Sequence, residues 1–231
     1  MRIIFRESTD DAPKLRAAMA RTATQVFFFV PNLIGYARVA LSVYSLAVAL
    51  TDFKTSVACY ALSFACDYFD GFFARWFDQC SSYGAVLDMV TDRCSTAGLL
   101  VILSHLYPDY MLVFLYLLIL DFASHWYHMY SSRGHHKNVS GERNFLLRFY
   151  YGVYPFFGFC CVGTELFYIL LYVLHFVPDV VIPGAELPVA TLCYYVCLPA
   201  CVCKNVVNVA QLCSAANAVA IQDAEAANKA K

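Results

Sequence analysis

Four aspartates lie close together in a part of the chain that is otherwise strongly apolar. Asp67 and Asp70 are followed by Asp88 and Asp92 within residues 66–95. Residues three or four apart are neighbours on the surface of a helix, so each pair shares one helical face. A short link joins the two predicted helices, which makes them antiparallel neighbours. We therefore expect the four carboxylates to converge.

Converging carboxylates repel one another unless protons or cations separate them. The basic residues near them in this stretch are Arg75 and Arg93, so we expect metal ions to neutralise the cluster. Carboxylate oxygens suit Mg²⁺ or Mn²⁺ better than zinc. Two divalent ions would balance four aspartates, and a pair of such ions is what phosphoryl transfer uses. The aspartates thus predict a dinuclear Mg²⁺ or Mn²⁺ site.

Residues with minimal side chains share the helical faces of the aspartates. Gly71, Ala74 and Gly84 would let a bulky ligand approach the helix backbones. Small residues also mediate packing between membrane helices, and both interpretations stay open. Arg75, near the end of its helix, either contacts the ligand or extends to the membrane surface.

The elements that position these residues are predicted to be transmembrane helices. The chain has 231 residues, 61% hydrophobic and 14% charged, whereas soluble domains average about 25% charged. Apolar runs cover 33–51, 55–77, 84–106, 110–130, 149–175 and 188–212. Each is near the ~20 residues that a helix needs to cross the hydrocarbon. The composition predicts an all-α integral membrane protein with six transmembrane helices.

The distribution of Lys and Arg predicts the orientation. Of 16 such residues, all but Lys54 fall on the side of the two termini and the long polar break at 131–148. This asymmetry places both termini in the cytosol. At 1.5 Å per residue, the aspartates lie about 6–15 Å below the cytosolic ends of their helices. A water-soluble reactant and a lipid headgroup could meet at that depth.

Three regions follow from these runs. Residues 1–29 form a cytosolic arm, within which 12–29 are either an amphipathic helix on the membrane surface or an unstructured tail. Residues 30–215 form the membrane domain, and residues 216–231 form a cytosolic tail.

The spacing of the acidic stretch resembles a known family. Asp67-x-x-Asp70-Gly71-x-x-Ala74-Arg75, eight further residues, Gly84, three residues, Asp88, three residues and Asp92 match the CDP-alcohol phosphotransferase motif at every fixed position. Within that family, eukaryotic phosphatidylinositol synthases are similar at Val30–Arg38, Leu87–Thr96, Ala123–Trp126 and Glu165–Tyr168.

The resemblance implies that a substituted phosphate passes from a CDP-linked donor to an alcohol, with release of CMP. It indicates CDP-diacylglycerol as donor and myo-inositol as acceptor, which gives phosphatidylinositol. It further implies a homodimer in the endoplasmic reticulum membrane, with the active site on the cytosolic side. No nucleic acid partner is expected.

The resemblance also implies residue roles. Asp67, Asp70 and Asp88 would be metal ligands, and Asp92 would be the general base and also touch a metal. The residues expected at the CDP-diacylglycerol site are Asn32, Gly71, Ala74, Arg75, Ser81 and Gly84.

The acceptor site is less constrained by sequence. Lys137 lies in a basic loop with Arg133, His135, His136 and Arg143, which either binds the acceptor or is an ordinary positively charged cytosolic loop. Asp121 and Glu165 are further acids in apolar runs. They either hydrogen-bond inositol hydroxyls or pair with His125 or Arg148.

Two other functions compete with this interpretation. A member of the same family could use glycerol 3-phosphate or serine as acceptor, or a CDP-choline or CDP-ethanolamine donor. A divalent-cation transporter would also need acids in its membrane helices. It would distribute them along a route across the bilayer, whereas the four aspartates cluster on the cytosolic half.

Overall fold

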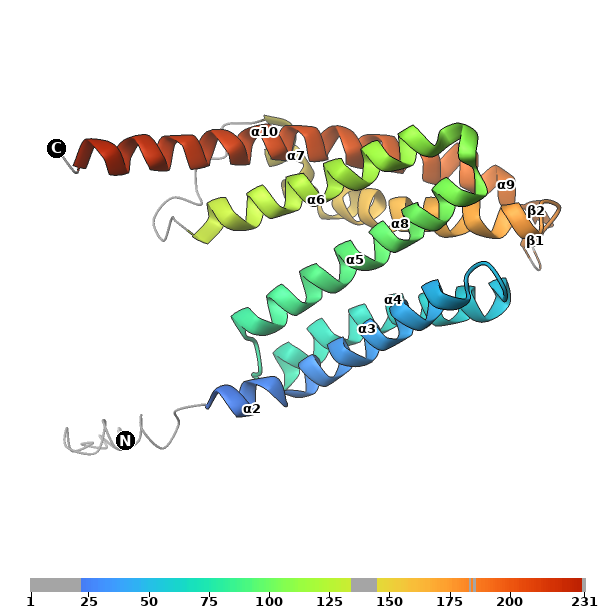
Figure 1. The fold of residues 1–231 in the computed structure, drawn as a ribbon, viewed down its shortest axis with the longest axis horizontal. Helices are drawn as coiled ribbons and strands as arrows, with labels where there is room; N and C mark the ends of the chain where they lie inside the picture. The colour runs from blue at the N-terminus through green and yellow to red at the C-terminus, as the bar shows by residue number, and fades with distance from the viewer. Residues whose placement is uncertain (1–21, 134–144, 183, 185, 230–231) are drawn as a thin grey trace, which may run out of the picture. The chain divides into compact units, whose positions relative to one another are not determined.

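The structure, a computed structural model, is almost entirely helical, which confirms the predicted all-α class. It describes residues 22–133, 145–182, 184 and 186–229. Its elements are α2 (Ala23–Phe27), α3 (Val30–Val48), α4 (Phe53–Trp76), α5 (Ser82–Leu106), the 3-10 turn η1 (Pro108–Tyr110), α6 (Met111–Arg133), α7 (Phe145–Gly152), α8 (Tyr154–Phe176), the short strands β1 (Val181–Ile182) and β2 (Leu187–Pro188), α9 (Val189–Leu192), the π-helical turn η2 (Cys193–Cys197) and α10 (Leu198–Lys229) (Figure 1).

Each apolar run contains a helix, but the last two runs differ from expectation. The run at 149–175 is broken at Val153, between α7 and α8. Pro155 lies in the first turn of α8, where its missing N–H is tolerated, whereas it would interrupt a continuous helix. The last helix continues beyond residue 212 to Lys229, through most of the predicted tail. That segment is rich in alanine, the best helix former.

Within the described residues, three helices are long and apolar enough to cross a membrane, at Pro108–Ser132, Tyr154–Phe176 and Val189–Lys229. Helices α3, α4 and α5 have 19, 24 and 25 residues. Charged residues interrupt the apolar sequences of α4 and α5, which carry the four aspartates. The count of six transmembrane helices stays a prediction.

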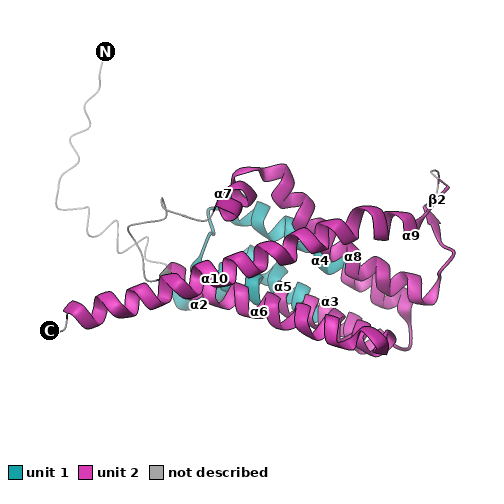
Figure 2. Cartoon of the chain, turned by 90° about the horizontal axis from the view of Figure 1, so that it is seen from above, with its two compact units in different colours: residues 1–41, 61–91 teal, residues 42–60, 92–231 magenta. Residues whose placement is uncertain are grey.

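The described chain divides into two units, and Figure 2 colours them separately. Unit 1 comprises residues 1–41 and 61–91, and unit 2 comprises residues 42–60 and 92–231. In unit 1, Thr22 and Gln25 form a capping box at the start of α2. The N–H of Val30 donates to Oε1 of Gln79, 2.8 Å away. This bond ties the start of α3 to the turn after α4. Of the predicted amphipathic segment, residues 12–21 lie outside the described residues.

In unit 2, α10 packs against both α6 and α8 (Figure 1), and the core also takes in residues of α5. Buried Leu103, Phe114 and Tyr172 belong to this core. The hydroxyl of Tyr172 donates to the carbonyl of Ala49 at 2.6 Å. A Cβ added at Gly163 would collide with the side chain of Ala200, so α8 and α10 approach closely at that point, as small residues allow.

Candidate active site

Three of the four predicted aspartates converge in unit 1, on one arginine. Nη2 of Arg38 lies 2.6 Å from Oδ1 of Asp67. Nη1 of Arg38 lies 2.7 Å from Oδ2 of Asp70 and 2.7 Å from Oδ1 of Asp88. One carboxylate oxygen from each aspartate lies within 4.8 Å of the others. The predicted convergence of the α4 and α5 acids is therefore confirmed for these three residues.

Arg38 corrects the expectation that Arg75 and Arg93 are the basic residues near the acids. Its guanidinium is buried and would be costly there without partners, and three carboxylates supply them. Sequence offered one signal: an arginine inside an apolar run is functional by default in a membrane protein. Arg75 lies along its own helix, with Nη1 3.6 Å from the position that a Cβ at Gly71 would occupy. Arg93 belongs to unit 2.

Arg38 also changes the charge balance of the site. Three carboxylates and one guanidinium leave a net charge of −2 (−3 + 1), from Asp67, Asp70, Asp88 and Arg38. One divalent cation would balance this group. The oxygen ligands, their spacing and the residual charge all fit Mg²⁺ or Mn²⁺. The sequence prediction of two divalent ions rested on the charge of four aspartates and did not include Arg38. The number of ions stays a prediction.

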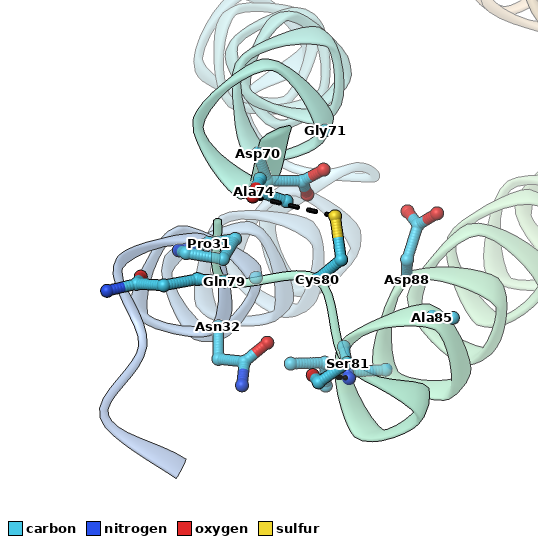
Figure 3. Close-up of a pocket in the computed structure, with 13 residues that line it drawn as sticks. Pro31, Asn32, Asp70, Gly71, Ala74, Gln79, Cys80, Ser81, Ala85 and Asp88 are labelled. Carbon is cyan, nitrogen blue, oxygen red and sulfur yellow. Dashed lines mark hydrogen bonds between the residues drawn. The ribbon is translucent and has the colours of Figure 1, made fainter. Parts of the chain in front are cut away.

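A cavity of about 180 Å³ adjoins the acids in unit 1 (Figure 3). Its lining includes two of the three converging acids, Asp70 and Asp88. It also includes five of the six residues predicted to bind the donor: Asn32, Gly71, Ala74, Ser81 and Gly84. The sixth, Arg75, lies on the exposed side of α4 beside Phe72 and Trp76. The structure thus brings the small residues and the acids to one concave site.

Gly84 has no room for a side chain. A Cβ there would lie 2.7 Å from Oδ1 of Asn32 and 3.2 Å from Oγ of Ser81. The N–H of Gly84 donates to Oγ of Ser81 at 3.0 Å, at the start of α5. The amide of buried Asn32 donates in turn to the carbonyl of Val26. The glycine therefore lets α3 and α5 bring two polar side chains together at the cavity.

Two polar lining residues, Gln79 and Cys80, were not singled out from the sequence. The thiol of Cys80 donates to the carbonyl of Ala74 at 3.5 Å, the dashed contact in Figure 3. Gln79 accepts the N–H of Val30, as described above. Both lie in the turn between α4 and α5, where residue types gave no signal of a ligand.

Asp92 lies in unit 2, where its neighbour in sequence, Arg93, contacts two acids. Nη2 of Arg93 is 3.7 Å from Oδ2 of Asp92. Nη1 of Arg93 donates to both carboxylate oxygens of Asp121, at 2.9 and 2.8 Å. Asp88 and Asp92 are one turn apart on α5. That Asp92 acts as the base and touches a metal stays a prediction.

The two predicted acceptor acids have protein partners in unit 2. Asp121 pairs with Arg93, and its carboxylate lies 3.4 Å from Nδ1 of His125. Glu165 accepts hydrogen bonds from Thr96 at 2.6 Å and Tyr60 at 3.0 Å. His125 thus lies beside Asp121, as one of the predicted alternatives has it. Arg148 is exposed on α7, and no ion pair joins it to Asp121 or Glu165 among the described residues. Whether these two acids bind the acceptor stays a prediction. Lys137, His135, His136 and Arg143 lie outside the described residues.

Comparison with known proteins shows which family has this arrangement. Residues 28–221 match the family model described as CDP-alcohol phosphatidyltransferase. The chain belongs to the CDP-alcohol phosphatidyltransferase family. This confirms the resemblance that the aspartate spacing indicated.

Relatives of this CDP-alcohol phosphatidyltransferase carry one activity in their names. A CDP-diacylglycerol–inositol 3-phosphatidyltransferase of Schizosaccharomyces pombe is 40% identical over 224 residues, 89% of this chain and 94% of the relative. The Homo sapiens protein of that name is 41% identical over 210 residues, 89% of this chain and 97% of the relative. A probable second form from Arabidopsis thaliana is 48% identical over 159 residues, 67% of this chain and 70% of the relative. No solved structure matches the chain.

Proposed function

We propose that this CDP-alcohol phosphatidyltransferase transfers the phosphatidyl group of CDP-diacylglycerol to myo-inositol, giving phosphatidylinositol and CMP. The observation that carries the proposal is the similarity, over nearly the whole chain, to relatives with that named activity. The converging Asp67, Asp70 and Asp88 support it, because a phosphate-transfer site needs hard oxygen ligands for divalent ions.

The donor would bind at the cavity of unit 1. The minimal side chains of Gly71, Ala74 and Gly84 leave the backbones of α4 and α5 open to its headgroup. Asn32 and Ser81 supply polar atoms at the same wall. Divalent ions held by Asp67, Asp70 and Asp88 would supply positive charge for the diphosphate when bound. Arg75, exposed on α4, would contact a phosphate of the lipid donor.

Asp92 would act as the general base. A carboxylate can accept the proton of one inositol hydroxyl as that oxygen attacks the lipid-side phosphorus. The new O–P bond forms while the bond to the CMP phosphate breaks, and CMP leaves with the electron pair. The guanidinium of Arg93 lies 3.7 Å from the Asp92 carboxylate and would help to orient it.

The cellular setting is proposed on the same basis. The chain would lie in the endoplasmic reticulum membrane as a multi-pass homodimer, with both termini and the active site in the cytosol. The asymmetry of Lys and Arg supports the orientation. Cysteine labelling of the two ends in sealed microsomes tests it, because cytosolic ends react with an impermeant reagent without detergent.

Release of CMP by the purified protein tests the proposed function. The protein in detergent receives CDP-diacylglycerol and Mn²⁺ or Mg²⁺, with inositol, glycerol 3-phosphate or serine in parallel. CMP only with inositol, and none with EDTA, is the expected result. CMP with another acceptor would overturn the substrate and keep the family chemistry. If no acceptor yields CMP, CDP-choline and CDP-ethanolamine are tested next as donors, and cation transport is tested after them.

A further inference from the structure

Helix α10 presents buried polar side chains on one face, within a run that the sequence showed as apolar. Lys204 is 8% exposed, Asn208 is 1% exposed and Gln211 is 2% exposed. They are three or four residues apart, so they line one stripe of α10. Polar side chains inside a membrane helix are costly and usually functional. Gln211 has a partner, since its Oε1 accepts from the hydroxyl of Tyr151 at 3.1 Å.

Lys204, unlike Gln211, has no hydrogen-bond partner in the described part of the chain. Among the residues that the structure describes, it forms neither an ion pair nor a hydrogen bond. Its Nζ lies over the ring of Tyr150, 5.4 Å from the centroid. Arg93 and Asp121 lie within electrostatic range of it. An ammonium has three N–H donors, so these donors are left for a ligand.

Asn208 has an acceptor without a partner. Its Nδ2 lies 3.3 Å from Oδ1 of Asp121 and donates to it. Its Oδ1 is buried and has no hydrogen-bond partner in the described part of the chain. If the amide of Asn208 were flipped, its Oδ1 would face the negatively charged carboxylate of Asp121. Electrostatic repulsion therefore favours the orientation in which Nδ2 faces Asp121. A buried acceptor left unsatisfied is unfavourable, which indicates a donor that arrives with a ligand.

Acids outnumber bases around these two residues. Arg93 and Lys204 are the bases, and the acids are Asp92, Asp121 and Glu165. A neutral ligand adds no charge to this group, whereas an anion such as a phosphomonoester would add a further buried negative charge. Lys204 offers donors and Asn208 offers an acceptor. A hydroxyl both donates and accepts, so a neutral polyol is complementary to the pair.

We propose that Lys204 and Asn208 bind hydroxyl groups of the neutral polyol acceptor, and that Arg93 and Asp121 hold Asn208 in place for this. Arg93 lies 3.7 Å from Asp92, so the polyol site adjoins the proposed base within unit 2. The proposal rests on the proposed function, and it names the residues that select an uncharged acceptor.

Steady-state kinetics of Asn208→Leu and Lys204→Met test it on the full-length protein with inositol and CDP-diacylglycerol. Each variant loses a hydrogen bond to the acceptor, so we expect KM for inositol to rise about tenfold. KM for CDP-diacylglycerol and the thermal midpoint without inositol should stay near wild type. Asn205→Leu is the matched control, because Nδ2 of Asn205 donates to the carbonyl of Cys201 on its own helix, at 2.8 Å. Unchanged KM for inositol in both test variants overturns the proposal.

A second measurement on the wild type does not depend on whether the variants fold. Inositols lacking one hydroxyl at each ring position serve as acceptors or competitors. We expect about a tenfold loss of affinity at the positions that Lys204 and Asn208 contact. Equal affinity for every deoxyinositol overturns the polyol site. A wild type that releases no CMP with inositol overturns the proposed function instead, so the two failures are distinguishable.

Discussion

The guanidinium Nη1 of Arg38 lies 2.7 Å from the carboxylate Oδ2 of Asp70, and both side chains are buried. Asp67 and Asp88 contact the same guanidinium at 2.6 and 2.7 Å. The candidate metal site therefore includes a positively charged side chain from α3, while the carboxylates come from α4 and α5. Arg38 offsets part of the repulsion among the acids before any metal binds, which has measurable consequences for stability.

Arg38→Gln should destabilise the metal-free protein more than the metal-loaded protein. Removing one partner of a buried ion pair costs about 3–5 kcal/mol. In EDTA three carboxylates would then face one another without a cation, whereas bound Mn²⁺ would supply positive charge in both proteins. We expect a lower unfolding midpoint in EDTA, and a larger upward shift on adding Mn²⁺ than wild type shows. Thermal unfolding in detergent with and without Mn²⁺ measures both.

The matched control for Arg38 is Arg148→Gln. Arg148 is exposed on α7, and surface substitutions usually change stability by less than about 0.5 kcal/mol. Equal destabilisation of Arg38→Gln in EDTA and in Mn²⁺ would contradict a link between Arg38 and the metal site. It would indicate that the arginine only contributes to helix packing.

Gly84→Ala should weaken donor binding. The new Cβ would lie 2.7 Å from Oδ1 of Asn32 and 3.2 Å from Oγ of Ser81, so one of these cavity residues must move. We expect KM for CDP-diacylglycerol to rise about tenfold, as for one lost hydrogen bond, with KM for inositol unchanged. Steady-state kinetics with each substrate varied in turn separates the two.

Gly158→Ala is the control for Gly84, since a Cβ there meets nothing within 4 Å. It lies within α8, where alanine favours the helix by up to ~1 kcal/mol over glycine. Normal kinetics with stability equal to or above wild type is expected. A Gly84→Ala variant with wild-type KM for the donor would show that the glycine serves helix packing alone.

Asp92→Asn should abolish most turnover while the protein stays folded. The amide has nearly the shape of the carboxylate but cannot accept the proton of the attacking hydroxyl. Loss of a general base typically lowers the rate about 10²–10⁴-fold. CMP release measures the rate, and Mn²⁺-dependent stabilisation shows whether Asp67, Asp70 and Asp88 still bind metal. Asp109→Asn, in the exposed turn before α6, should behave as wild type. Near-normal turnover by Asp92→Asn would rule out this residue as base.

Sequence predicted the helices and acids well because both depend on local spacing. Apolar runs gave every long helix, and intervals of three or four residues gave the shared face of Asp67 and Asp70 on α4 and that of Asp88 and Asp92 on α5. Arg38 was missed as their partner because 29 residues separate it from Asp67, and only helix packing brings them together.

Two features were not predicted from the sequence: the helix break at Val153 and the buried polar face of α10. Pro155 signals a helix start, but the apolar run continues across it, so the break at Val153 was not anticipated. Lys204 and Asn208 lie inside the apolar run 188–212, among apolar residues and cysteines. Their burial on a polar face depends on how α10 packs against α6 and α8, which composition does not reveal.

The hydrogen bonds of Glu165 lead to a last prediction, on whether this acid binds the acceptor or holds helices together. Its Oε1 accepts from Thr96 and its Oε2 accepts from Tyr60, at 2.6 and 3.0 Å. Both oxygens therefore have donors from α5 and α4. We expect Tyr60→Phe to lower the free energy of unfolding by about 1.5–3 kcal/mol, as for a hydrogen bond to a charged group. KM for inositol should stay within twofold of wild type.

Tyr107→Phe provides the comparison for Tyr60. Its hydroxyl donates to the neutral carbonyl of Leu171 at 3.0 Å, so its loss should cost about 0.5–1.5 kcal/mol. Chemical denaturation measures the two free energies, and initial rates measure KM. If Tyr60→Phe instead leaves stability unchanged and raises KM for inositol, then Glu165 and Tyr60 belong to the acceptor site. In that case the donors seen on Glu165 would be exchanged for inositol hydroxyls during the reaction.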